Sequence, residues 1–224
     1  METTLELPQA LTYAALKQRH RDVREHSAEF LNLRVHRSLS WLNRAEQCDD
    51  DDGAYVFLWI AFNAAYANDS GHVRPTEMER FGQFIQRIVS LDKQELLSDL
   101  VWQQYSQAIR VLLYNPYVYQ RYWDFHNQKP GVSEWEDSFY GAKQKAHKAL
   151  AQQRTDAVLN IVVERLYTLR NQLVHGGATW NSSVNRNQLR DGKRILASLV
   201  PAVISIMLDR RTAHWGEPYY PVRG

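Results

Sequence analysis

Hydrophobic residues along this chain recur every three or four positions over long stretches, which is the spacing of amphipathic helices. The few glycines and prolines stand between those stretches. The periodicity predicts helices over about Ser27–Gln47, Tyr55–Asn68, Pro75–Val89, Leu91–Leu113, Gln152–His175 and Ser183–Leu208. We therefore expect an all-α fold.

Three of these expected helices carry further local signals. The first has an apolar stripe beside Arg34, made of Phe30, Leu31, Val35, Leu39 and Leu42. The acidic run CDDDDG before Tyr55 predicts a capped and solvated helix start, with metal binding as the less favoured alternative. Pro201 lies inside the last helix and predicts a kink there.

Aromatic residues are concentrated in the middle of the chain. Eleven of the 26 aromatic residues fall between Trp102 and Tyr140. Prolines and a glycine interrupt Tyr114–Tyr140, so the pattern predicts an irregular stretch with short helical pieces within an insertion over residues 115–150. Its aromatics could stack on nucleotide bases, but such residues also fill cores and subunit interfaces. Residues 212–224 are expected to form a non-helical tail, on the surface or against a partner.

Composition narrows the class of protein. The chain has 224 residues, 44% of them hydrophobic, which is enough for one large domain or two small ones. We expect a single domain over residues 1–224. Its 27 basic and 25 acidic residues nearly balance, so any nucleic-acid-binding face must be local. A lone cysteine, Cys48, excludes an intramolecular disulfide and fits a reducing compartment. METTLELPQA lacks a secretory pattern and the apolar run Tyr55–Ala67 is too short to span a bilayer, so we expect a cytoplasmic protein without membrane insertion.

The stretch LRNQLVHGG places Arg170, Asn171 and His175 near the end of a predicted helix. Spacing alone is weak evidence, because chance supplies about two such arginine and histidine pairs in this composition. Arg21 with His26 and Arg121 with His126 are others, the first in a charge-dense segment and the second in the aromatic stretch.

Position on the helix separates the copy at Arg170 from the other two. Its apolar stripe predicts a polar face on the opposite side, made of Glu164, Thr168, Asn171 and His175. Asn171 precedes His175 by one turn, from where its amide can reach the imidazole. Arg170 lies about 140° around the helix from His175. The two can converge through the length of the arginine, a distorted helix end or a second subunit.

Histidine with arginine suits phosphodiester chemistry. An imidazole can move a proton to or from a ribose 2′-hydroxyl or a leaving oxygen, while a guanidinium neutralises charge that develops on the phosphate. The alternative is structural: both side chains would then only interact with the last carbonyls of the helix. Gly176 and Gly177 are expected to end the helix.

RNQLVHGG, placed just before a final long helix, resembles the signature of the HEPN superfamily. FLWIAFNAAY at 57–66 is similar to the second helix of its Apea-like branch. This resemblance implies a four-helix-core bundle that dimerises so that two motifs line one cleft, here with extra helices and the aromatic-rich insertion. Many members are metal-independent endoribonucleases of toxin, antiphage-defence or RNA-processing systems. Carried over by position, Arg170 would contact phosphate, His175 would be the acid or base, and Asn171 the intervening polar residue.

The sequence thus leads to a primary hypothesis and alternatives. The first is a homodimeric, metal-independent endoribonuclease that needs no cofactor, acts on RNA and has an antitoxin or another regulatory protein as a partner. The second is a catalytically inactive HEPN-like module that binds RNA, a nucleotide or a protein. A purely structural dimer is the third.

Overall fold

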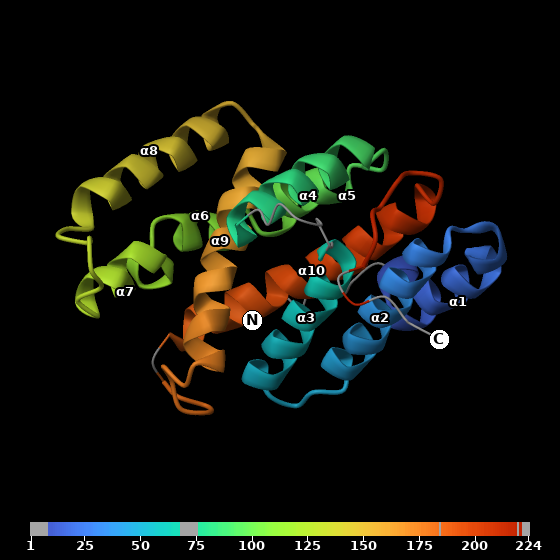
Figure 1. Ribbon diagram of the computed structural model, residues 1–224, viewed down its shortest axis with the longest axis horizontal. Coiled ribbons are helices and arrows are strands. Elements are labelled where there is room, and N and C mark those ends of the chain that lie inside the picture. The colour runs from blue at the N-terminus through green and yellow to red at the C-terminus, as the bar shows by residue number, and fades with distance from the viewer. Residues whose placement is uncertain (1–8, 68–75, 184, 219, 221–224) are drawn as a thin grey trace. The chain divides into compact units, whose positions relative to one another are not determined.

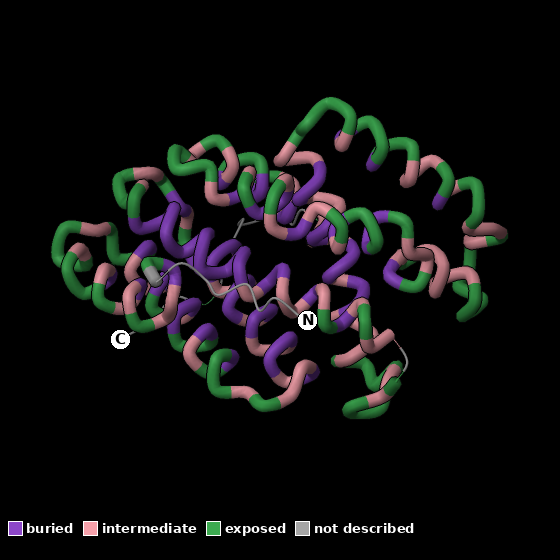
Figure 2. Tube along the Cα trace, turned by 180° about the vertical axis from the view of Figure 1, so that it is seen from behind, coloured by how far each residue is buried: buried purple, intermediate pink, exposed green. Residues whose placement is uncertain are grey.

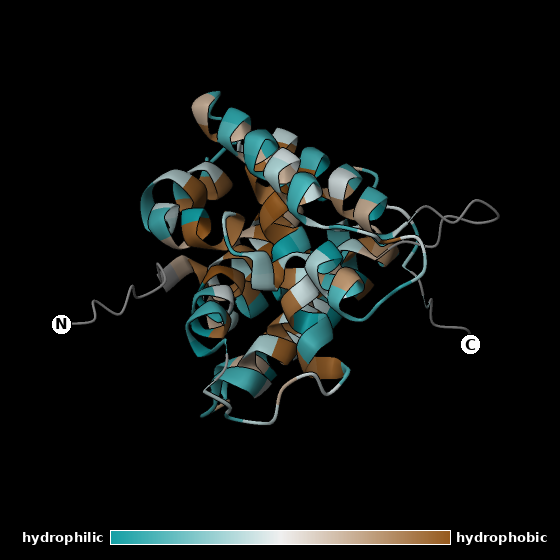
Figure 3. Cartoon of the chain, turned by 90° about the vertical axis from the view of Figure 1, so that its left-hand side faces the viewer, coloured by the Kyte–Doolittle hydropathy of each residue, from teal (hydrophilic) through white to brown (hydrophobic). Residues whose placement is uncertain are grey.

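The computed structural model describes residues 9–67, 76–183, 185–218 and 220, and across these ranges the chain is all-helical, without a β-strand. The all-α prediction is confirmed. The chain divides into two compact units, Met1–Thr76 with Lys193–Gly224, and Glu77–Gly192 (Figure 1). The expectation of one domain over residues 1–224 stays a prediction. Hydrophobic positions form stripes along the helices (Figure 3), which is the pattern that the sequence carries.

The first unit contains three helices from the N-terminal part of the chain and most of the last helix. Their bounds are α1 Tyr13–Val23, α2 Glu29–Glu46, α3 Asp51–Tyr66 and α10 Arg186–Asp209, with short 3-10 turns η1 Gln9–Leu11 and η2 Arg24–His26. α2 packs along α3 and against α1. Arg19 of α1 donates to Ser205 and Asp209 of α10, and Lys193 of α10 pairs with Asp51 of α3.

Local expectations for this unit hold in most places. Asp50 caps α3, since its carboxylate accepts from the backbone N–H of Gly53 at 2.7 Å. The stripe of α2 is buried except for Phe30, which is exposed. Arg34, expected beside the stripe, is itself buried. α10 continues through Pro201, and the kink predicted there stays a prediction.

The tail expected over residues 212–224 is non-helical in its described part, but it is not merely a surface segment. Trp215 is buried and its indole N–H donates to the carbonyl of Arg210. The carbonyls of Gly216 and Glu217 accept from Arg34 of α2. The tail therefore packs on the chain's own first unit, because a buried guanidinium needs acceptors that α2 cannot supply.

The second unit is organised around one central helix. Its elements are α4 Glu77–Leu91, α5 Leu96–Asp99, η3 Leu100–Gln104, α6 Ser106–Leu113, η4 Pro116–Val118, α7 Gln120–His126, α8 Glu136–Ala151 and α9 Thr155–Val174. α4, α6, α8, η3 and η4 all pack against α9. Four positions of the predicted stripe of α9, Leu159, Val162, Leu166 and Leu169, are buried there.

Two expectations for this unit need correction. Leu91–Leu113 is not one periodic helix: η3 is a π-helical turn, in which the N–H of Tyr105 reaches the carbonyl of Leu100, and it separates α5 from α6. The irregular stretch expected over Tyr114–Tyr140 ends earlier, since α8 begins at Glu136 and runs for 16 residues. α8 is largely exposed (Figure 2) and buries only Phe139, Ala146 and Ala149, so its weak apolar pattern hid it.

Candidate functional site

The end of α9 is closed by backbone groups. Gly176 is left-handed with φ of 70°, its N–H donates to the carbonyl of Leu173, and the N–H of Gly177 donates to Gln172 at 2.7 Å. This is the paired ending that glycine permits. The N–H of His175 also donates to the carbonyl of Asn171. The predicted helix end at these glycines is confirmed, and the carbonyls of Asn171, Gln172 and Leu173 accept from backbone N–H groups rather than from the arginine or histidine side chains.

The three predicted site residues lie together at this end of α9 in different environments. Arg170 and Asn171 are half-buried, whereas His175 is exposed. The Arg170 guanidinium donates from Nη1 to the amide oxygen of Asn171 at 3.0 Å. Among the described residues, no hydrogen bond joins the His175 imidazole to either of them. Asn171 therefore positions the arginine rather than the histidine.

The polar face predicted for α9 is only partly correct. His175 is exposed, as expected, but Thr168 is buried and its hydroxyl donates back to the carbonyl of Glu164. Arg165 is buried as well. Helices pack on several sides of α9, so the middle of its polar face is covered and only its end reaches the surface.

Gln172 is a site residue that the sequence did not indicate. Its side-chain amide donates to the carbonyl of Tyr117 at 2.7 Å and accepts from Asn185 at 3.2 Å, while its backbone carbonyl accepts from Gly177. One residue thus joins η4 and both ends of the loop that follows α9. No pattern marks a glutamine for this role, because its partners are 55 and 13 residues away.

A second cluster lies further along α9, around Arg165. The guanidinium stacks over the ring of Tyr119 at 4.6 Å and lies 6.0 Å from the ring of Phe139. Burial lowers the pKa of Arg165, with Glu164 acting in the opposite direction. Burial also raises the pKa of Glu164, and the charges of Arg165 and Lys145 oppose that rise.

The aromatics from Tyr114 to Tyr140 include a packed group and an exposed group. Phe139 is buried and Tyr119, Tyr122 and Trp135 are half-buried, and their rings contact one another at 4.9 to 5.8 Å. These rings form a small core, as expected for aromatics that fill the protein interior rather than stack on nucleotide bases. Tyr114, Tyr117 and Tyr140 remain exposed.

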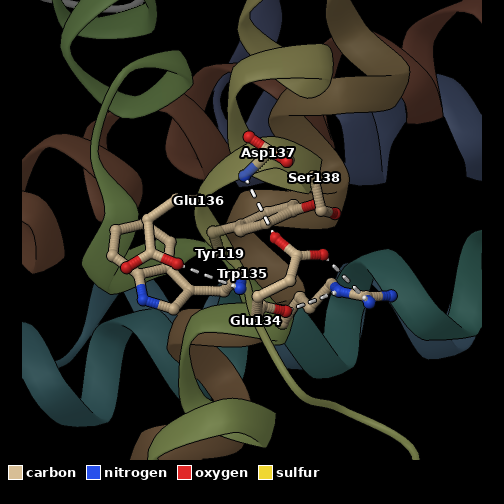
Figure 4. A network of polar contacts seen from close by, with 7 residues as sticks. Tyr119, Glu134, Trp135, Glu136, Asp137 and Ser138 are labelled. Carbon is tan, nitrogen blue, oxygen red and sulfur yellow. Dashed lines mark hydrogen bonds and ion pairs between the residues drawn. The ribbon is translucent and has the colours of Figure 1, made fainter.

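The pairs Arg21–His26 and Arg121–His126 do not form comparable sites. Arg21 and His26 are both exposed, which fits a solvated face. Arg121 is held by Glu134, through the backbone carbonyl at 3.3 Å and the carboxylate at 3.7 Å, at the start of α8 (Figure 4). His126 instead contacts the rings of Tyr122 and Phe125.

The described residues contain no cluster of three or more His, Cys, Asp or Glu residues that could hold a metal ion. Nor does any described helix have the length and apolar character needed to cross a membrane. A scan against protein-family models, a search of curated proteins and a search of solved structures each found no match.

Proposed function

We propose that this chain is a metal-independent endoribonuclease of the HEPN type, with a HEPN-like bundle that dimerises to complete its catalytic centre. The observation that carries the proposal is the end of α9. An exposed histidine lies five residues after an arginine that is held by the intervening asparagine, and the backbone alone caps the helix. The structural alternative expected both side chains to interact with the last carbonyls of the helix, and among the described residues neither is hydrogen-bonded to them.

The chemistry follows from these groups. The neutral imidazole of His175 takes the proton of a ribose 2′-hydroxyl as O2′ attacks the adjacent phosphorus. Arg170 binds the non-bridging oxygens and stabilises the charge that develops on them. The P–O5′ bond breaks, and the leaving oxygen takes a proton from the imidazolium of the second subunit. The products are a 2′,3′-cyclic phosphate and a free 5′-hydroxyl.

Dimerisation has a physical motive in this proposal. One imidazole is needed as base and another as acid in the same step, and one chain offers a single histidine at the site. A toxin or defence role follows the resemblance, with an antitoxin or regulatory protein as partner.

The test uses purified protein, RNA and a chelator. We expect cleavage with 2′,3′-cyclic phosphate ends, and a loss of at least about 100-fold in rate for His175→Ala. His147→Ala is the matched control, because it removes another exposed histidine, on α8. Sedimentation shows whether the variants keep their oligomeric state. Equal cleavage by His175→Ala, or binding without cleavage by the parent chain, would contradict the proposal; the latter would favour the inactive binding module.

A further inference from the structure

Two exposed aromatic rings lie on the elements that meet at the end of α9. Tyr117 of η4 is 47% exposed, and Trp180, in the loop after α9, is 74% exposed. An exposed tyrosine or tryptophan ring offers its face to a flat ligand. Both are on elements tied to Gln172, which lies one turn before His175.

The backbone around Tyr117 is firmly held. Its N–H donates to the side chain of Asn115 at 2.8 Å, and its carbonyl accepts from Gln172 and from the indole of Trp123. The ring packs edge-on against Tyr122 at 5.4 Å. A ring fixed in this way loses little conformational entropy when a flat ligand stacks on it.

The loop that carries Trp180 is closed by the same residue. Its first turn begins where Gly177 donates to the backbone carbonyl of Gln172, and it ends where Asn185 donates to the Gln172 side chain. Gln172 therefore ties the backbone at Tyr117 and both ends of the loop that carries Trp180 to the last turn of α9, which also leads to His175.

The stretches of chain that carry the two rings have an excess of positive charge. No acidic residue occurs between Asp99 and Asp124 or between Glu164 and Asp191, stretches of 24 and 26 residues that pack together through η3, α6, η4 and α9. At the average of the whole chain, they would hold about five or six. They contain six arginines. All of them except the buried Arg165 are exposed or half-buried: Arg110, Arg121, Arg170, Arg186 and Arg190. An excess of arginine over acidic residues suits a polyanion.

We infer that Tyr117 and Trp180 are stacking platforms for two bases of a single-stranded RNA, which hold its backbone against Arg170 and His175. Single strands expose the faces of their bases, and an aromatic ring stacks on any base. The inference deepens the proposed function by naming the substrate class and the residues that bind it. It commits to an RNA strand as the occupant, since the two stretches that carry the rings contain arginines and no acidic residue, and positive charge complements phosphate.

The test measures binding in the His175→Ala background, so that cleavage cannot confuse it. The probe is a fluorescein-labelled 20-nucleotide oligo(A) RNA, compared with its duplex with oligo(U). We expect the single strand to bind more tightly than the duplex, and Tyr117→Ala and Trp180→Ala each to weaken binding about tenfold. Tyr117→Phe should bind as the parent does, because it keeps the ring.

Tyr140→Ala is the matched control. The exposed fraction of Tyr140 is 60%, between those of Tyr117 and Trp180, but Tyr140 belongs to α8, which lies toward the opposite end of α9 from the loop of Trp180 (Figure 1). Unchanged binding in both Tyr117→Ala and Trp180→Ala would overturn the inference. A shift of these two variants from dimer to monomer in sedimentation would also overturn it, since the rings would then be subunit contacts.

The outcomes separate this inference from the proposed function. Ring-dependent binding by a chain that never cuts RNA would support the stacking platforms and contradict the nuclease. If the parent chain cleaves RNA and the loss of either ring has no effect, the nuclease would be supported and the stacking platforms contradicted.

Discussion

Among the described residues, each compact unit buries one arginine, and the two are stabilised differently. Arg34 is 1% exposed and Arg165 is 3% exposed. Arg34 donates to the carbonyls of Ala65, Gly216 and Glu217. Among the described residues, no hydrogen bond or ion pair reaches the guanidinium of Arg165, which contacts the faces of Tyr119 and Phe139.

The difference shows that burial alone does not measure what a charge contributes. A hydrogen bond to a charged group is worth about 1.5–3 kcal/mol, whereas a desolvated cation–π contact is worth about 2 kcal/mol. Three carbonyl acceptors can offset the cost of burying Arg34, and they also tie the tail to α2. Arg165 gains much less free energy from its ring contacts, so the burial of its charge has a high electrostatic cost. Burial lowers the pKa of Arg34 to about 10, so that it remains charged at neutral pH.

Arg34→Met should give the largest effect. It leaves the three carbonyls without their donor, one of them at the end of α3, and we expect a loss of about 3 kcal/mol in the free energy of unfolding. Urea denaturation measures it. Arg37→Met, at a half-buried position on the same helix, should change stability by less than about 0.5 kcal/mol. Equal losses in the two variants would show that the carbonyl contacts carry no special weight.

Arg165→Met should be nearly neutral, within about 1 kcal/mol, or stabilising, because relief of the buried charge offsets the lost ring contacts. Arg165→Lys should instead destabilise the protein, since an ammonium is more strongly hydrated and cannot stack as a planar group does. The same denaturation experiment compares them. A loss above about 2 kcal/mol in Arg165→Met would mean that the two buried arginines are equivalent after all.

These two residues also show how far the sequence leads. Helices α2 and α9, and the end of α9 next to Gly176, could be predicted because they follow from local residue spacing. Arg34 looked like the edge of a stripe because its acceptors lie 31, 182 and 183 residues away. Arg165 falls beside the apolar face, and its burial depends on rings from the insertion, which periodicity does not place.

The candidate site divides in the same way. Its motif residues could be found because they share one helix end, and the helix stop was visible in two glycines. Gln172 could not, since its role exists only after η4 and the loop have folded against α9. The two exposed rings were counted among the aromatics, but sequence alone did not distinguish them from those that form the small core.

Glu164→Gln should have the smallest effect, and its pH dependence gives the sharpest test. Burial raises the pKa of Glu164 above its ordinary value of 4.5, so the folded state holds a proton that the unfolded state releases. Stability therefore falls as pH rises from about 4.5 through the folded pKa and is then constant. Glutamine keeps an acceptor for Asn160 and removes the charge. We expect Glu164→Gln to raise the free energy of unfolding by less than about 1 kcal/mol at pH 7 and to leave it unchanged below pH 4.5.

Combining Glu164→Gln with Arg165→Met tests whether the charges of Glu164 and Arg165 are coupled. Without Arg165, the carboxylate of Glu164 loses the larger of the two attractions that oppose the rise of its pKa. At pH 7, Glu164→Gln should then raise the free energy of unfolding more in the Arg165→Met background than in the parent chain. Thermal unfolding of the four proteins at pH 4 and pH 7 completes the cycle. An equal gain with and without Arg165 would mean that Arg165 is held by its aromatic contacts alone, with no contribution from the neighbouring carboxylate.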